Sequence, residues 1–118
     1  MISSQYSFPS SNRLSNSEAF AKVFKQSKKL HTPEFSVYLR QNGLESARLG
    51  LAVSKKTAKK AVTRNKIKRI IRESFRLRKG QMRGLDIIIV AKPNASLISK
   101  AKLFEVTQKI WGRIGKNA

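Results

Sequence analysis

The chain has 118 residues, with 26 lysines and arginines against 6 aspartates and glutamates, which gives a formal net charge of +20 at pH 7. Apolar residues make up 40% of it, enough for one hydrophobic core, and the length fits a single domain. Such a positive surplus favours a polyanionic partner such as nucleic acid, because binding releases condensed counterions. The absence of cysteine excludes disulfides, thiolate nucleophiles and cysteine-ligated zinc sites.

Side chains that carry hydrolytic chemistry are few and scattered. The single histidine, His31, lies in a loop-like segment before Pro33, and the six acidic residues show no catalytic or metal-binding spacing. We therefore expect neither a catalytic residue nor a metal site in this chain. The N-terminus has no targeting pattern and the apolar run 87–91 is too short to span a membrane, so we expect a cytoplasmic protein. A polybasic membrane-surface protein is the weaker alternative, because no long amphipathic anchor is present.

The first half of the chain predicts a helix followed by two strands. Residues 1–12, rich in Ser, Asn and Pro, are expected to form a flexible arm, and residues 13–118 a single domain. Ser15 and Glu18 form a capping-box pattern for a helix over 16–27. Alternating apolar residues predict strands at 35–40 and 49–54, which we expect to pair as an antiparallel hairpin. The second strand carries only small residues on one face, which suits contact with a helix or a ligand backbone.

The second half predicts a helix, a buried strand and a third helix. Helical periodicity over 61–77 gives an apolar stripe of Val62, Ile67, Ile70, Ile71, Ser74 and Phe75. Residues 85–90 are apolar without alternation, as expected of a central strand covered on both faces. A third helix over 100–115 is expected to pack through Trp111. The order α-β-β-α-β-α predicts a small α+β domain, an α/β sandwich with helices packed on one sheet.

The second predicted helix and its flanks carry an unusual concentration of positive charge. Twelve lysines and arginines lie between Val53 and Gly80, opposed only by Glu73. Solvated helix faces usually mix both signs, so this excess favours phosphate binding over a merely solvated surface. Arginine binds phosphate oxygens bidentately and lysine acts as a mobile point charge, which suits a folded RNA as well as DNA.

The order of residues in this region is more specific than its charge. The segment RLGLAVSKK at 48–56 is followed by AVTRNKIKRIIRESFR at 61–76, a basic helix that contains an Arg-Asn pair. Together with 13–24, 35–38 and 86–91, these segments closely resemble the protein subunit of bacterial ribonuclease P. The resemblance therefore covers most of the chain.

The resemblance implies that an RNA subunit removes the 5′ leader of precursor tRNA in a magnesium-dependent reaction, and that the protein assists. The Mg²⁺ would be held mainly by the RNA, and no residue of this chain would be catalytic. It also implies a left-handed β-α-β crossover, contrary to the general right-handed rule. The residues that match the family's contacts to the catalytic RNA are Lys55, Arg64, Asn65, Lys68, Arg69, Arg72 and Arg76. Those that match its leader contacts are Phe20, Phe24, Tyr38, Ser54 and Lys56.

Physical arguments support these roles but leave alternatives open. Single-stranded RNA stacks its bases on aromatic rings, yet Phe20 and Phe24 also fall on the apolar stripe of their helix, where core packing would explain them. Tyr38 lies on the strand face opposite Phe35, so one core cannot account for both. A ribosomal or general RNA-binding structural protein is the main alternative function. A DNA-binding regulator would usually be a symmetric dimer, and no dimer seam is visible, so no DNA partner is expected.

Overall fold

The computed structural model describes residues 12–14 and 17–117. Residues 1–11 of the predicted arm and Ser15 of the predicted capping box lie outside the described residues. Asn12 is buried, and its side-chain amide donates a hydrogen bond to the carbonyl oxygen of Ala47 at 2.7 Å. Its Oδ1 accepts a hydrogen bond from Lys79 Nζ at 3.1 Å. Asn12 therefore links the loop before β3 (Arg48–Ala52) to the turn that follows α2 (Ala61–Arg78).

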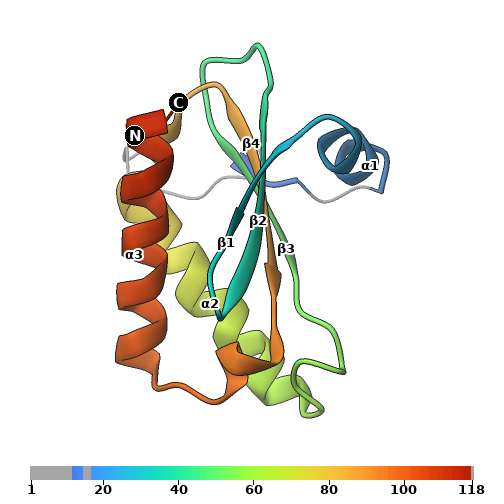
Figure 1. Cartoon of the computed structure of the whole chain (residues 1–118), viewed down its shortest axis with the longest axis vertical. Coiled ribbons are helices and arrows are strands. Elements are labelled where there is room, and N and C mark those ends of the chain that lie inside the picture. Colours follow the sequence, from blue (N-terminus) through green and yellow to red (C-terminus); the bar gives the residue numbers. More distant parts are fainter. Residues whose placement is uncertain (1–11, 15–16, 118) are drawn as a thin grey trace, which may run out of the picture.

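The predicted order of helices and strands is present, with one short strand added before the first predicted strand (Figure 1). The elements are α1 (Ser17–Lys25), β1 (Lys28–His31), β2 (Phe35–Gln41), β3 (Arg48–Ala52), α2 (Ala61–Arg78), β4 (Leu85–Ala91) and α3 (Lys100–Asn117), with 3-10 turns at Lys79–Met82 and Pro93–Ser96. The expected loop around His31 is wrong, because this residue ends β1. Its side chain is exposed, and Nδ1 lies 3.2 Å from Ser36 Oγ on the paired strand.

The strands form one sheet in the order β1-β2-β4-β3. The predicted hairpin of the second and third strands is wrong, because β4 lies between them, antiparallel to β2 and parallel to β3. Apolar residues on both faces of β4 are buried best between two strands that are themselves covered, which explains its central place. The parallel neighbours β3 and β4 are joined through α2, which is a β-α-β crossover.

Helices cover both faces of the sheet, so the predicted sandwich is confirmed. On one face, α2 and α3 pack over a core that includes Phe35, Val37 and Ile89. On the other face, α1 packs over a smaller core around Leu14 and Ile88, with Val23 and partly buried aromatic side chains. Alternation along β2 thus sends neighbouring side chains to two different cores.

Most of the predicted stripe of α2 is buried, but Val62 is 72% exposed. At about 100° per residue, Val62 lies about 140° around the helix from Ile67, so it points away from the sheet. Ser74 is fully buried and joins α2 to α3, because its Oγ lies 2.8 Å from Trp111 Nε1, which donates a hydrogen bond to it. The expected packing role of Trp111 is therefore confirmed.

Candidate nucleic-acid interface

The outer face of α2 carries the predicted contacts to the catalytic RNA. Asn65, Arg69 and Arg72 are exposed, and Lys68 is half-buried. Among the described residues, neither Arg69 nor Arg72 has an ion-pair or hydrogen-bond partner, so both guanidinium groups are free to bind phosphate. Lys55 is exposed in the loop between β3 and α2, outside the helix. Most of the predicted set therefore shares one helix face.

Two arginines of this predicted set already have partners within the protein. Arg64 donates hydrogen bonds to the carbonyl oxygens of Ala58 and Lys59 at 2.9 and 2.8 Å, which fixes the loop that leads into α2. Arg76 pairs with Glu73 at 2.9 Å, and this hydrogen bond holds the pKa of the Glu73 carboxyl below its usual value. Between them, Arg69 and Arg72 keep charges that no ion pair among the described residues offsets.

The predicted leader residues of α1 and β2 form one aromatic surface on the other side of the sheet. The rings of Phe20 and Phe24 meet edge to face with centroids 6.2 Å apart, and those of Phe24 and Tyr38 meet in the same way at 4.8 Å. Phe24 is 42% exposed, whereas Phe20 and Tyr38 are half-buried. Core packing therefore accounts for part of Phe20, but it does not account for the exposed ring of Phe24.

The small-residue face of β3 lies under α1, as the sequence suggested. A Cβ atom added to Gly50 would lie 2.6 Å from Phe20 Cζ and 2.8 Å from Phe20 Cε1. The hydrogen atom of this glycine thus allows the tip of the ring to approach the strand closely. Gly50 sets the position of the first ring of the aromatic surface.

Ser54 and Lys56 lie in the loop that follows β3, and not on α1 or β2, which carry the rings of the aromatic surface. Both are exposed, and Ser54 Oγ accepts a hydrogen bond from the backbone N–H of Thr57 at 3.3 Å. Thr57 in turn donates from Oγ1 to the carbonyl oxygen of Ala91 at 2.8 Å. Ser54 therefore shapes this turn, and Lys56 beside it has no ion-pair partner in the described part of the chain.

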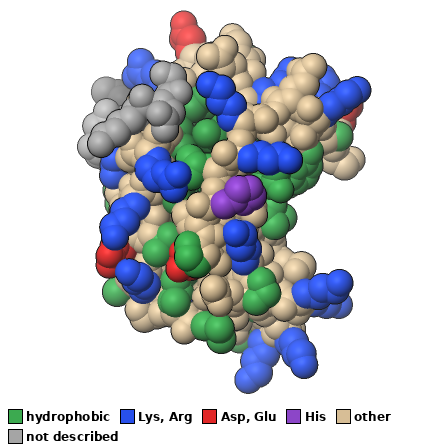
Figure 2. All heavy atoms as spheres, viewed as in Figure 1, with side chains coloured by type: hydrophobic (Ala, Val, Ile, Leu, Met, Phe, Trp, Pro, Cys, Tyr) green, Lys and Arg blue, Asp and Glu red, His purple; other side chains and the backbone are tan. Residues whose placement is uncertain are grey.

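The two predicted surfaces meet at the outer edge of β3. A cleft of about 280 Å³ is lined there by Phe20 of α1, by Lys68 and Arg72 of α2, and by Arg13 and Leu49. Aromatic and cationic side chains from opposite sides of the sheet thus border one recess. Figure 2 shows how widely Lys and Arg side chains cover the visible face and how few Asp and Glu side chains accompany them.

Two cationic residues of this region were not predicted from the sequence. Lys29 of β1 places its Nζ 5.8 Å from the ring centroid of Tyr38, a cation–π geometry that follows from their pairing across the two strands. Arg13 lies at the cleft beside β3 and forms a parallel bridge with Leu49. Recognition of β1 as a strand would have revealed Lys29, because its register with β2 places it opposite Tyr38.

Three acidic residues, Glu73, Asp86 and Glu105, form ion pairs within the described part of the chain. Asp86 is buried, and Arg48 donates to its two carboxylate oxygens at 2.8 and 2.7 Å, while Asn42 donates to it at 2.9 Å. The hydrogen bond to Asp86 raises the pKa of Arg48. Within the described ranges, no three His, Cys, Asp or Glu side chains gather where a metal ion would fit, and no helix has the length and hydropathy to cross a membrane. The arrangement is suited to binding polyanions.

Comparisons with known proteins agree with this arrangement. The family model described as Ribonuclease P matches residues 8–115. A ribonuclease P protein component of Vibrio cholerae is 42% identical over 113 residues, 96% of each chain, and one of Photobacterium profundum is 41% identical over 104 residues, 88% of each.

Solved structures show the same relationship. The RNase P protein of Thermotoga maritima has a TM-score of 0.78 at 34% identity, covering 86% of this chain and 96% of its own. A mutant RNase P protein of Staphylococcus aureus has a TM-score of 0.81 at 32% identity, covering 90% of this chain and 89% of its own. The match in sequence along almost the whole length, together with the match in fold, shows that this chain belongs to the ribonuclease P protein family.

Proposed function

We propose that this chain docks on the catalytic RNA of ribonuclease P through the outer face of α2 and holds the 5′ leader of precursor tRNA on its aromatic surface. The observation that carries the proposal is the cleft at β3, where Phe20 from the aromatic surface borders the same recess as Lys68 and Arg72. An RNA leader that leaves the aromatic surface at this edge meets the cations of α2 directly. One protein thus contacts substrate and catalyst side by side.

The mechanism we infer is electrostatic and does not use a protein nucleophile. Two RNA molecules that approach each other repel through their phosphates, and unpaired arginines such as Arg69 and Arg72 reduce this repulsion by displacing counterions. Stacking of leader bases on Phe24 and Tyr38 then favours the precursor over the mature product, which has no leader. The protein would therefore tighten substrate binding and lower the magnesium concentration that cleavage requires.

Three of the described acidic residues are already held by cations of the protein, which makes them poor ligands for a magnesium ion. Asp86 is buried against Arg48, and Glu73 and Glu105 are held in ion pairs with neighbouring cations. A protein site for Mg²⁺ uses one or more available carboxylates, usually with several waters retained on the ion. We therefore assign the magnesium of the reaction mainly to the RNA subunit. We also place the particle in the cytoplasm, where its RNA partners are processed.

The proposal is tested by two variants that affect different partners. Arg69→Gln is expected to weaken binding to the catalytic RNA about tenfold, because it removes one exposed phosphate contact. Tyr38→Ala is expected to weaken the reconstituted particle's binding of precursor tRNA about tenfold while leaving mature tRNA unchanged, since one base loses its stacking partner. Both affinities are measured by filter binding with labelled RNA.

Matched variants control for the loss of one positive charge and for the loss of the Tyr38 hydroxyl group. Lys100→Gln removes an exposed charge at the start of α3 and should leave both affinities unchanged, and Tyr38→Phe keeps the stacking ring. Equal loss of precursor and mature tRNA by Tyr38→Ala would remove Tyr38 from the leader surface. If the protein bound duplex DNA or unrelated RNA as tightly as the catalytic RNA, a general nucleic-acid-binding protein would replace the proposal.

A further inference from the structure

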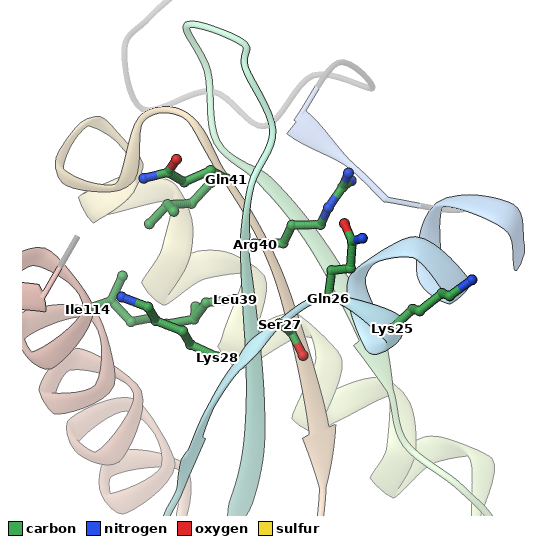
Figure 3. Close-up of a pocket in the computed structure, with 9 residues that line it drawn as sticks. Lys25, Gln26, Ser27, Lys28, Leu39, Arg40, Gln41 and Ile114 are labelled. Atoms are coloured by element: carbon green, nitrogen blue, oxygen red, sulfur yellow. The ribbon is translucent and has the colours of Figure 1, made fainter.

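A larger cleft of about 670 Å³ lies at the edge of the sheet opposite β3, where β1 stops pairing with β2 (Figure 3). Lys28 pairs with Leu39, and the remaining residues of β2, Arg40 and Gln41, lie beyond the last pair with β1. The volume falls in the range of about 300–1,000 Å³ that is typical of sites for small ligands. The functions assigned above do not use this cleft.

The lining of the cleft combines two kinds of chemistry on the two sides of the strand edge. On the α1 side, Arg40 and Lys25 contribute cationic groups, and on the α3 side Leu39 and Ile114 contribute apolar surface with Lys28 beside them. None of the described residues that line it is acidic. Cationic groups beside an aliphatic surface match a single nucleotide, which joins an anionic phosphate to a flat, weakly polar base.

A hydroxyl group within the cleft lining has no partner. Ser27 Oγ is buried, and it forms no hydrogen bond with any described residue. Buried polar groups are nearly always hydrogen-bonded, and this exception lies at the junction of α1 and β1. Rotation about χ1 moves the hydroxyl between staggered positions, so a polar atom of a ligand would offer it a partner.

The position of the cleft continues the path marked by the aromatic surface. Helix α1 crosses the sheet from β3, where Phe20 lies over Gly50, to β2, where Phe24 meets Tyr38. Lys25 follows Phe24 directly and enters the lining of the cleft. The cations of α2 border the opposite, β3 edge, so the cleft lies at the end of the path farthest from the proposed catalytic RNA.

We propose that this cleft binds one unpaired nucleotide of the leader, upstream of the nucleotides that contact Tyr38. Arg40 and Lys25 hold its phosphate, while its base lies against Leu39. The inference rests on the proposed function, because it extends the same leader surface around the edge of the sheet. It predicts that the protein senses leader length beyond the aromatic surface.

The test uses the particle reconstituted from the catalytic RNA and the full chain. Its affinity is measured for mature tRNA and for precursors whose leaders are lengthened one nucleotide at a time. With the unaltered protein, affinity should rise in two stages, first as the leader reaches the aromatic surface and again as it reaches the cleft. In the double variant Lys25→Gln, Arg40→Gln the second stage should be lost, a decrease of about tenfold that is confined to long leaders.

Controls separate this inference from the function on which it rests. Lys100→Gln also removes an exposed charge, at the opposite end of α3 from Ile114, and should retain both stages. If the double variant matches the unaltered protein at every leader length, the cleft inference is wrong while the leader surface stands. If it weakens mature and precursor tRNA equally, the cleft does not hold the leader. If the unaltered particle binds all leaders and mature tRNA equally, the proposed function itself is contradicted.

Discussion

Gly50 determines where the ring of Phe20 lies, because any larger residue would occupy the same space. The nearest atoms belong to the end of a movable side chain, so the strand itself can remain in place while the ring is displaced. The third atom near the added Cβ is Leu14 Cβ at 3.1 Å, which leaves this methyl group little further room. The aromatic surface is therefore sensitive to one methyl group on β3.

We predict that Gly50→Ala weakens the particle's binding of precursor tRNA several-fold, by about tenfold at most, while docking to the catalytic RNA is unchanged. The reason is that the displaced Phe20 ring disturbs the ring stack but not the cations of α2. Affinities for both RNAs, with the melting temperature as a check on folding, measure the effect. Gly80→Ala, where an added Cβ meets nothing within 4 Å, is the matched control. Unchanged precursor affinity in a folded variant would contradict the role of the ring.

Alternation along one strand was enough to predict that Tyr38 faces away from the residues of the main core. The same reasoning did not reveal Lys29, because KKLH is a short, mostly exposed strand with one buried residue and no clear period. The partner of Asp86 was equally hidden, since Arg48 is 38 residues away in the chain and meets it only through the pairing of β3 with β4. Local sequence patterns show which face a side chain takes, whereas they do not show what lies across from it.

The helices α2 and α3 are joined by a buried polar cluster at their contact. Ser74 Oγ lies 2.7 Å from Thr107 Oγ1, 2.8 Å from Gln108 Nε2 and 2.8 Å from Trp111 Nε1. Such a cluster holds two helices in one register, because a shift would leave buried donors without partners. The orientation of the α2 face that we propose to bind RNA is thus fixed from its buried side.

We predict that Ser74→Ala lowers the free energy of unfolding by about 1–3 kcal/mol, because the indole N–H of Trp111 and the amide of Gln108 lose a buried acceptor. Urea denaturation followed by Trp111 fluorescence measures the loss. The variant touches no exposed cation, so at a temperature where it remains folded it should bind the catalytic RNA as the unaltered protein does. An unchanged unfolding midpoint would show that the cluster adds nothing to stability.

The helices and the central strand were predictable from the sequence, since long periodic segments and an unbroken apolar run carry clear signals. The predicted bounds 61–77 and 100–115 differ from those of α2 and α3 by no more than two residues at either end. The order of the strands was not predictable in the same way. The choice between a β2–β3 hairpin and the insertion of β4 depends on contacts far apart in the chain, which no local pattern records.

At the scale of the whole molecule, the net charge of +20 should dominate the affinity for RNA. If about 6–10 phosphates are contacted, the affinity for the catalytic RNA should fall by about 10³–10⁵ between 50 and 200 mM salt. Titrations over this range give the number of released counterions from the slope. Affinity that does not change with salt would contradict an interface built on Arg and Lys contacts to phosphates.

The central claim, that this chain assists an RNA catalyst, is tested most directly by cleavage of a labelled precursor tRNA at low magnesium. A bacterial ribonuclease P RNA is incubated with the substrate alone and with this protein, beside the protein alone. We expect cleavage to a mature 5′ end only when RNA and protein are combined, because the protein offsets the repulsion that magnesium would otherwise screen. Cleavage by the protein alone, or no gain when it is added to the RNA, would contradict the account.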